Sequence, residues 1–199
     1  MKVDFIFDFA SPNAYCCHKV IPEIHDRTGI KFNYIHCLLG GIFKLTNNQA
    51  PMIQFSEIKN KLDYEGIEME RFMKKHNLNK FKMNSNFPIT TVGLQRGALV
   101  AEKMGFVEEY RDKVLQAMWE DDINLGDQEI LMNFVKDFDK KVYFKVDKYS
   151  SISTSLSFPK KILSLTKKVG TPKEPLSTAM LVLSNNCCFI SSEVISLKK

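Results

Sequence analysis

Ser11 and Pro12 place a hydroxyl group at the predicted start of a helix, directly after the apolar run of residues 3–9. A serine before the first helical turn accepts a hydrogen bond from a free backbone N–H, and proline suits the first helical position. The free N–H groups and positive dipole end of a helix also favour an anion or a thiolate there. Two interpretations therefore stand: a helix cap alone, or a site where the Ser11 hydroxyl acts on a bound anionic group.

Two predicted strands and one helix position this turn. In residues 3–9, valine and phenylalanine alternate with mostly polar residues, which is typical of a strand. Apolar residues then follow at helical spacing until Gly29, which predicts where the helix ends. A second alternating run over residues 30–37 predicts another strand. A β-α-β unit of this length implies two parallel strands with a right-handed crossover.

Helical spacing of apolar residues dominates from about residue 52 to residue 137, with a break over residues 79–89. One predicted helix is closed by Gly105, and another is capped by Asp127. Three predicted apolar stripes are Phe55, Ile58 and Leu62; Met69, Phe72 and Met73; and Val107, Tyr110, Val114 and Met118.

The residues from about 150 onward are rich in serine and lysine. A helix is predicted over residues 158–169 and a β-hairpin over residues 178–190. The order of elements is therefore β-α-β, a helical block, then α-β-β-α. This order predicts an α/β fold of the thioredoxin type, in which an all-helical insertion opens the sheet domain.

Composition limits the functions that the chain can have. Its 199 residues and 44% hydrophobic content fit one compact domain. The net charge of +5 comes from scattered lysines rather than arginine clusters, so nucleic acid is not an expected partner. No apolar run is long enough to span a membrane and no signal peptide is evident. We therefore expect a cytoplasmic protein, although a mitochondrial or peroxisomal location is also compatible.

The five cysteines argue against disulfide and metal chemistry. C-x-x-C is absent, and the two Cys-Cys doublets and four scattered histidines do not have the spacing of zinc ligands. We therefore expect no metal, and we expect buried free thiols.

The residues around the Ser-Pro turn resemble a known family. Residues 3–43, VDFIFDFASPNAYCCHKVIPEIHDRTGIKFNYIHCLLGGIF, are similar to the opening of the 2-hydroxychromene-2-carboxylate isomerases. These enzymes are relatives of the kappa-class glutathione transferases and of the bacterial DsbA-like disulfide oxidoreductases. The similarity covers roughly residues 2–135 and continues through Lys44–Gln49, Lys59–Tyr64, Asn84–Pro88 and Ala117–Glu120.

The resemblance implies a single thioredoxin-like (DsbA-like) domain over residues 1–199. Its N-terminal βαβ half covers residues 1–45, its helical insertion residues 52–137, and its divergent C-terminal αββα half residues 150–199. Relatives are commonly homodimers, so we expect a homodimer here.

The resemblance further implies a glutathione site at the Ser-Pro turn. Disulfide oxidoreductases carry C-x-x-C where this chain has Ser11-Pro12-Asn13-Ala14, so both sulfurs of a disulfide cycle are missing at those positions. With Pro12 and Asn13 beside it, Ser11 is implied to stabilise the thiolate of bound glutathione, helped by the helix dipole. The implied activity is a glutathione-dependent isomerisation, in which the thiolate adds reversibly to a small aromatic or electrophilic substrate.

More glutathione contacts are implied outside the turn. Asn48 offers an amide to the peptide backbone and Lys61 offers a charge to a carboxylate. The alternatives are a turn-forming asparagine and a surface lysine. Trp119 belongs either to the substrate pocket or to the core. Relatives carry a cis-proline landmark before the hairpin. Pro172 and Pro175 compete for it, and Pro175 is the better placed relative to the predicted hairpin.

Beyond the hairpin, the chain departs from the family's pattern. Relatives carry a Gly-x-Asp-Arg-like stretch there, whereas this chain has Ile190-Ser191-Ser192-Glu193. Either the tail has diverged, or it derives from an altered reading frame. Two other functions therefore stay open beside the isomerase: a kappa-like glutathione transferase, and a non-catalytic binding protein with a thioredoxin fold.

Overall fold

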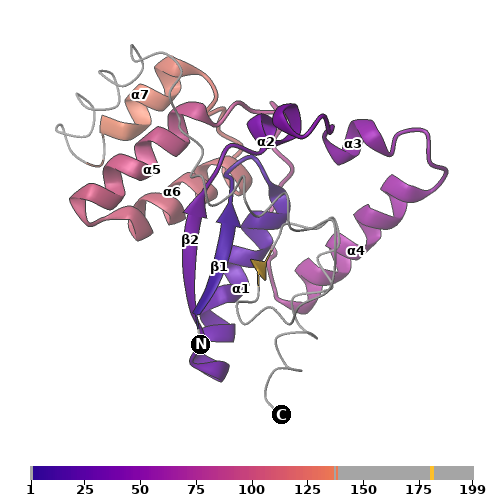
Figure 1. Cartoon of the computed structure of the whole chain (residues 1–199), viewed down its shortest axis with the longest axis horizontal. Helices are drawn as coiled ribbons and strands as arrows, with labels where there is room; N and C mark the ends of the chain where they lie inside the picture. The colour runs from indigo at the N-terminus through magenta and orange to yellow at the C-terminus, as the bar shows by residue number, and fades with distance from the viewer. Residues whose placement is uncertain (1, 137, 139–179, 182–199) are drawn as a thin grey trace.

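The computed structural model describes residues 2–136, 138 and 180–181 (Figure 1). Within them, two parallel strands and a helix form an N-terminal unit, and the following helices gather on both sides of it. The strands are β1 (Lys2–Phe7), β2 (Lys31–His36) and β3 (Met180–Leu181), and the helices are α1 (Pro12–Thr28), α2 (Leu39–Leu45), α3 (Pro51–Gln54), α4 (Lys61–Lys75), α5 (Val92–Met104), α6 (Val107–Trp119) and α7 (Gln128–Lys136).

β1 lies at the centre of the described sheet, whose strand order is β2-β1-β3. β1 and β2 pair in parallel, with Phe7 opposite His36, so the predicted β-α-β unit is confirmed. β3 also runs parallel to β1 and falls within the hairpin predicted over residues 178–190. The rest of that hairpin, and the helix predicted over residues 158–169, lie outside the described residues.

The sequence signals at both ends of α1 are confirmed. Ser11 is the N-cap, whose Oγ accepts a hydrogen bond from Ala14 N at 3.2 Å, and Pro12 occupies the first helical position. Gly29 ends the helix in the left-handed conformation, with φ of 67°, and donates its N–H to the His25 carbonyl. The buried face of α1 consists of Ala14, Tyr15, Cys16, Cys17, Val20 and Ile24.

One predicted stripe is wrong. Phe55 and Ile58 lie in the turns between α3 and α4, whereas Leu62 lies in α4, so the three residues do not share a helix. Asn60, just before α4, has a left-handed backbone with φ of 62°, which an α-helix does not continue through. Ile58 is accordingly 53% exposed rather than buried on a helix face.

The other helical predictions that fall on described residues are confirmed. Phe72 of α4 is buried in the core, with Met69 and Met73 half-buried beside it on the same helix. Gly105 ends α5 with φ of 81°, and Asp127 Oδ1 accepts two hydrogen bonds from the first turn of α7. The fully buried members of the predicted stripe on α6 are Tyr110, Val114 and Met118.

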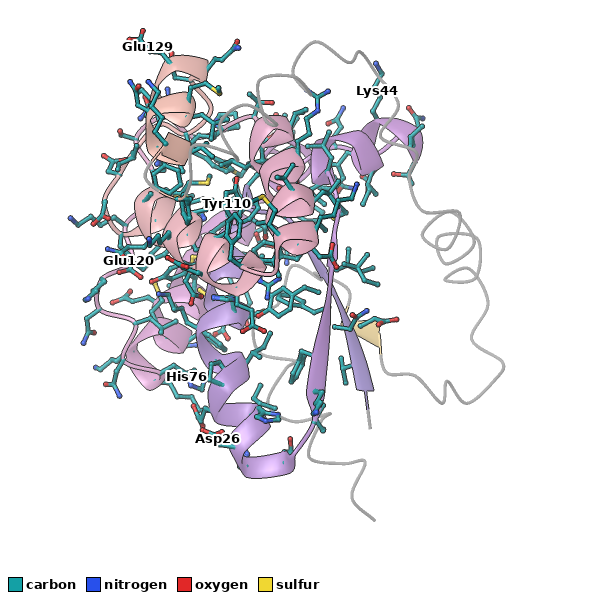
Figure 2. All side chains as sticks on the ribbon, turned by 90° about the vertical axis from the view of Figure 1, so that its left-hand side faces the viewer. Asp26, Lys44, His76, Tyr110, Glu120 and Glu129 are labelled. Atoms are coloured by element: carbon teal, nitrogen blue, oxygen red, sulfur yellow. The ribbon has the colours of Figure 1, made fainter. Side chains whose placement is uncertain are left out.

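Aromatic side chains join the sheet to the helical block. Phe9, just after β1, packs edge-on against Tyr110, with ring centroids 6.1 Å apart. Tyr110 lies in the interior of the helical block (Figure 2), where its hydroxyl donates to the Leu94 carbonyl at 3.1 Å. Trp119 stacks on Phe81 in the same core. None of the described helices has the length and apolar character that crossing a bilayer requires.

Candidate functional site

Ser11 lies just beyond the carboxyl end of β1, where the chain turns into α1. The residue is 6% exposed, its N–H donates to the Asp8 carbonyl at 3.1 Å, and its carbonyl accepts from Tyr15 N at 3.2 Å. Because Oγ accepts the Ala14 N–H, the hydroxyl proton is left to donate, and the described residues offer it no acceptor. The turn therefore presents one hydrogen-bond donor at the N-terminus of a 17-residue helix.

The turn has no sulfur nucleophile of its own. Ala14 stands three residues after Ser11, and Cys16 and Cys17 are buried deeper in α1. Burial, reinforced by the charge of Asp8, raises the pKa of the Cys37 thiol to about 12, so this thiol stays protonated near neutral pH. In the part of the chain that the structure describes, no group of three His, Cys, Asp or Glu side chains could hold a metal ion.

Asp8, the last polar residue before the turn, is 1% exposed, and its carboxylate receives four hydrogen bonds. Oδ1 accepts from Ala10 N at 3.1 Å, from Thr91 Oγ1 at 2.7 Å and from Gln95 Nε2 at 2.9 Å. Oδ2 accepts from Leu39 N at 2.6 Å. The carboxylate therefore joins the Ser-Pro turn to the start of α5 and to the first residue of α2.

None of the sequence predictions includes this carboxylate. Its signal in the sequence is an acidic residue inside an apolar strand, next to a turn with a candidate site. Asp4 gives a similar signal in the same strand, yet it is only half-buried and accepts a hydrogen bond from Asn33 Nδ2. The pattern alone therefore does not separate the buried carboxylate from the other one.

His36 extends the network around Asp8. A carboxylate only accepts, so Gln95 turns its NH₂ group toward Asp8 and its Oε1 toward His36 Nδ1, 3.0 Å away. His36 Nδ1 therefore carries the proton of a neutral imidazole. Burial, together with the charge of Arg111, lowers the pKa of His36 to about 4, against the opposing effect of the Gln95 hydrogen bond.

We expect the free energy of unfolding to fall as the pH drops from about 6.5 to about 4. Over that window the unfolded chain binds a proton at His36 that the folded chain does not bind, so acid favours unfolding. Urea unfolding at a series of pH values measures the effect. A His36→Gln variant, which keeps an N–H for Gln95, should show a flatter pH dependence, and an equally steep one would contradict this assignment.

The end of α6 supports the turn and α1 from the interior. Trp119 is fully buried and its Nε1 donates to the Phe9 carbonyl at 3.0 Å, which places it in the core. Glu120 Oε1 accepts from Tyr15 OH at 3.0 Å and lies 2.7 Å from Lys19 Nζ. Burial pushes the pKa of Glu120 upward, but the hydrogen bonds and charge from these partners outweigh it and hold the pKa below its usual range.

Comparison with known families adds an independent observation. The family model of the DSBA-like thioredoxin domain matches residues 2–141. The chain belongs to this family. The predicted DsbA-like thioredoxin fold is thereby confirmed, with its strand-turn-helix start, its small sheet and its mostly helical content.

A solved structure shares this DsbA-like thioredoxin fold. The selenomethionine structure of a 2-hydroxychromene-2-carboxylate isomerase matches the chain with a TM-score of 0.58 and 22% sequence identity. The match covers 73% of this chain and 70% of that chain. At this identity the likeness shows the fold alone. Among curated proteins, none matches the chain.

In this DsbA-like thioredoxin domain, three predicted site residues are neighbours. Ser11, Pro12 and Asn13 form the cap and first turn of α1. Asn48 is exposed in the loop between α2 and α3, and its Oδ1 accepts from Gln49 N at 2.8 Å. Figure 1 shows α2 and α3 at the end of the sheet where β1 stops, so this loop lies at the same end of the molecule as the turn.

The remaining predicted site residues lie further along the chain. Lys61 begins α4, and its Nζ lies 3.1 Å from Glu65 Oε1. Within the described ranges, no hydrogen bond or ion pair joins Ser11 to Asn48 or to Lys61. Pro175 lies outside the described residues. The roles of these residues toward glutathione stay predictions.

Proposed function

We propose that the chain is a glutathione-dependent isomerase of the 2-hydroxychromene-2-carboxylate type, in which the Ser11 hydroxyl stabilises the thiolate of bound glutathione. The observation that carries the proposal is the turn itself, a buried hydrogen-bond donor at a helix N-terminus without a sulfur of its own. Family membership, and the fold shared with an isomerase structure, support it.

The residues of the turn fit a thiolate. Ser11 Oγ accepts the Ala14 N–H, so the hydroxyl proton is available to a bound thiolate. The N-terminus of α1 adds the positive end of a helix dipole, which lowers the pKa of a thiol held there. When bound, glutathione supplies a thiolate nucleophile that adds to an electrophilic carbon of the substrate and leaves again.

Ser11 is better suited to holding a charge than to forming a bond. A serine nucleophile needs an adjacent general base, usually a histidine oriented by a third group. Among the described residues, the partner of Ser11 Oγ is a backbone N–H rather than such a base. The arrangement therefore favours a thiol brought by the ligand over attack by the serine oxygen.

The other proposed glutathione contacts are Pro12, Asn13, Asn48, Lys61 and Pro175. Of these, Lys61 has a partner that bears on the proposal, because its Nζ already faces the Glu65 carboxylate at 3.1 Å. A carboxylate of glutathione would compete with Glu65 for this charge, so we assign Lys61 a modest share of the binding free energy.

Calorimetric titration of the full chain with glutathione tests the proposal. We expect saturable binding at or below millimolar concentration, which strengthens as the pH rises through the pKa of the bound thiol. S-methylglutathione, which has no ionisable thiol, is the matched control and should bind more weakly and without this pH dependence. Absence of binding at millimolar glutathione would contradict the proposal and favour a non-catalytic binding protein.

Turnover assays separate the two enzymatic alternatives. An isomerase converts 2-hydroxychromene-2-carboxylate while the concentration of free glutathione thiol stays constant. A kappa-like transferase instead consumes glutathione in proportion to its product. Loss of free thiol in that proportion would therefore replace the isomerase by the transferase.

We also propose that the chain forms a homodimer through an exposed apolar surface on α2–α4, the segment between residues 45 and 67. Most of the large hydrophobic side chains that the described residues leave exposed belong to this segment, and exposed apolar side chains that gather on one face mark interaction surfaces. The residues of this α2–α4 surface are Leu45, Met52, Ile53, Ile58, Leu62, Tyr64 and Ile67.

Ile53→Lys is expected to convert the dimer to a monomer in sedimentation velocity, because Ile53 is 63% exposed and a buried lysine charge would oppose association. Leu99→Lys is the matched control, since Leu99 is an exposed apolar residue of α5 outside the α2–α4 surface. A wild-type chain that sediments as a monomer at every concentration would contradict the dimer.

A further inference from the structure

We propose that Asp8 is the positioning residue of the Ser11 site, a role that rests on the proposed function. Its carboxylate fixes the Ser-Pro turn relative to two other segments, the start of α2 and the start of α5. The place of the Ser11 hydroxyl is then set by the helical insertion as well as by β1 and α1.

Two hydrogen bonds of Asp8 act on the turn itself. Its backbone carbonyl accepts from Ser11 N at 3.1 Å, and its Oδ1 accepts from Ala10 N at 3.1 Å. The second bond runs from a side chain to the backbone two residues on, as in an Asx-turn. Movement of the carboxylate therefore displaces Ala10 directly and displaces Ser11 through the backbone that they share.

Three more donors hold the carboxylate from outside the turn. Thr91 Oγ1 and Gln95 Nε2 donate to Oδ1 at 2.7 and 2.9 Å, and Leu39 N donates to Oδ2 at 2.6 Å. A carboxylate that is 1% exposed is stable only when such donors satisfy it. Because hydrogen bonds are directional, this network fixes the distance and orientation between the turn and the two helices.

The negative charge of Asp8 opposes the binding of a thiolate at Ser11. An effect of Asp8 through its charge and an effect through the position of Ser11 therefore change glutathione affinity in opposite directions. A carboxylate near the turn disfavours a thiolate there. If Asp8 acted through its charge, neutralising it would strengthen thiolate binding. If Asp8 acts by positioning Ser11, the same change weakens binding, because the donor leaves its place.

Three variants test the proposal. Asp8→Asn removes the charge and turns one oxygen into an NH₂ group among donors. Thr91→Val removes one donor to Asp8 at nearly constant shape. Asp4→Asn is the matched control, because Asp4 is a carboxylate of the same strand that accepts from Asn33 Nδ2.

We expect Asp8→Asn to weaken glutathione binding about tenfold and to speed amide hydrogen exchange at Ala10 and Leu39 about tenfold, relative to amides inside α6. Thr91→Val should change both in the same direction by less, and Asp4→Asn should change neither. Calorimetry and exchange followed by NMR give these two readouts independently of turnover.

Each other outcome has a defined meaning. Tighter glutathione binding in Asp8→Asn would assign the effect of Asp8 to its charge and overturn the proposal. Faster exchange with unchanged glutathione affinity would also overturn it. So would exchange at Ala10 and Leu39 that is as slow as in the wild type. If Asp8→Asn does not fold, Thr91→Val decides instead: weaker glutathione binding with faster exchange at Ala10 and Leu39 supports the proposal, and a variant in which either stays unchanged overturns it. If the wild type does not bind glutathione, the proposed function fails, whereas the exchange readout still tests whether Asp8 positions the turn.

Discussion

Replacing Ser11 with alanine is expected to lower the turnover of 2-hydroxychromene-2-carboxylate about 100-fold while the chain stays folded. The substitution removes the buried hydroxyl, which is the preorganised donor of the proposed site. It also removes the N-cap of α1, at a cost of about 1 kcal/mol in the free energy of unfolding. Glutathione should still bind, but more weakly, because the variant loses the donor to the thiolate and keeps the other proposed contacts.

Two further variants separate the hydroxyl from the helix cap. Ser11→Gly loses the hydroxyl but destabilises a helix start much less than alanine does, so it should lose as much turnover as Ser11→Ala. Asp127→Ala removes the cap of α7, where Oδ1 accepts from Glu129 N and Ile130 N, and should lower stability with turnover unchanged.

The pH dependence of the rate provides a second readout for Ser11. Without the donor, the pKa of the bound thiol rises, so the profile of the residual activity should move to higher pH. Wild-type turnover in either Ser11 variant would contradict the proposal that the Ser11 hydroxyl stabilises the glutathione thiolate.

Trp119→Ala is expected to lower the free energy of unfolding by about 3–5 kcal/mol, the largest stability effect that we predict. Trp119 is fully buried and stacks on Phe81 with ring centroids 5.8 Å apart, so truncation leaves a cavity. The Phe9 carbonyl also loses the hydrogen bond from Trp119 Nε1, 3.0 Å away, which lowers the free energy of unfolding further. Because Phe9 is two residues before Ser11, glutathione affinity should fall as well.

Trp119→Phe isolates the contribution of the indole N–H. It keeps a large ring but leaves the Phe9 carbonyl without its donor, so we expect a smaller loss of about 1–3 kcal/mol. Urea unfolding followed by far-UV circular dichroism measures both variants, since Trp119 is the chain's single tryptophan and its fluorescence is lost on substitution. A loss below about 1 kcal/mol for Trp119→Ala would contradict its place in the core.

The N-terminal unit could be predicted because its signals are local. Ser11, Pro12 and Gly29 act on backbone groups within a few residues of themselves, and both ends of α1 lie where these residues indicate. Alternation over residues 3–9 and 30–37 likewise depends only on neighbouring positions, and both strands are present.

The contacts that complete the site could not be predicted in this way, because they join residues that are far apart in the chain. Asp8 bonds to Gln95 across 87 positions, and Phe9 bonds to Trp119 across 110. No local propensity encodes such pairs. The stripe that included Phe55 failed for a related reason, since apolar spacing does not show where a helix breaks.

These distant partners also determine when, during synthesis, the site can mature. The ribosome synthesises residues 1–45, which contain β1, the Ser-Pro turn and α1, before it synthesises α5 and α6. The Asp8 carboxylate gains the Gln95 donor only after α5 has been synthesised, and the Phe9 carbonyl gains the Trp119 donor only after α6 has been synthesised. While Trp119 is still inside the exit tunnel, the Phe9 carbonyl of the nascent chain lacks its donor, so we expect the Ser11 turn to reach its final geometry only late in translation.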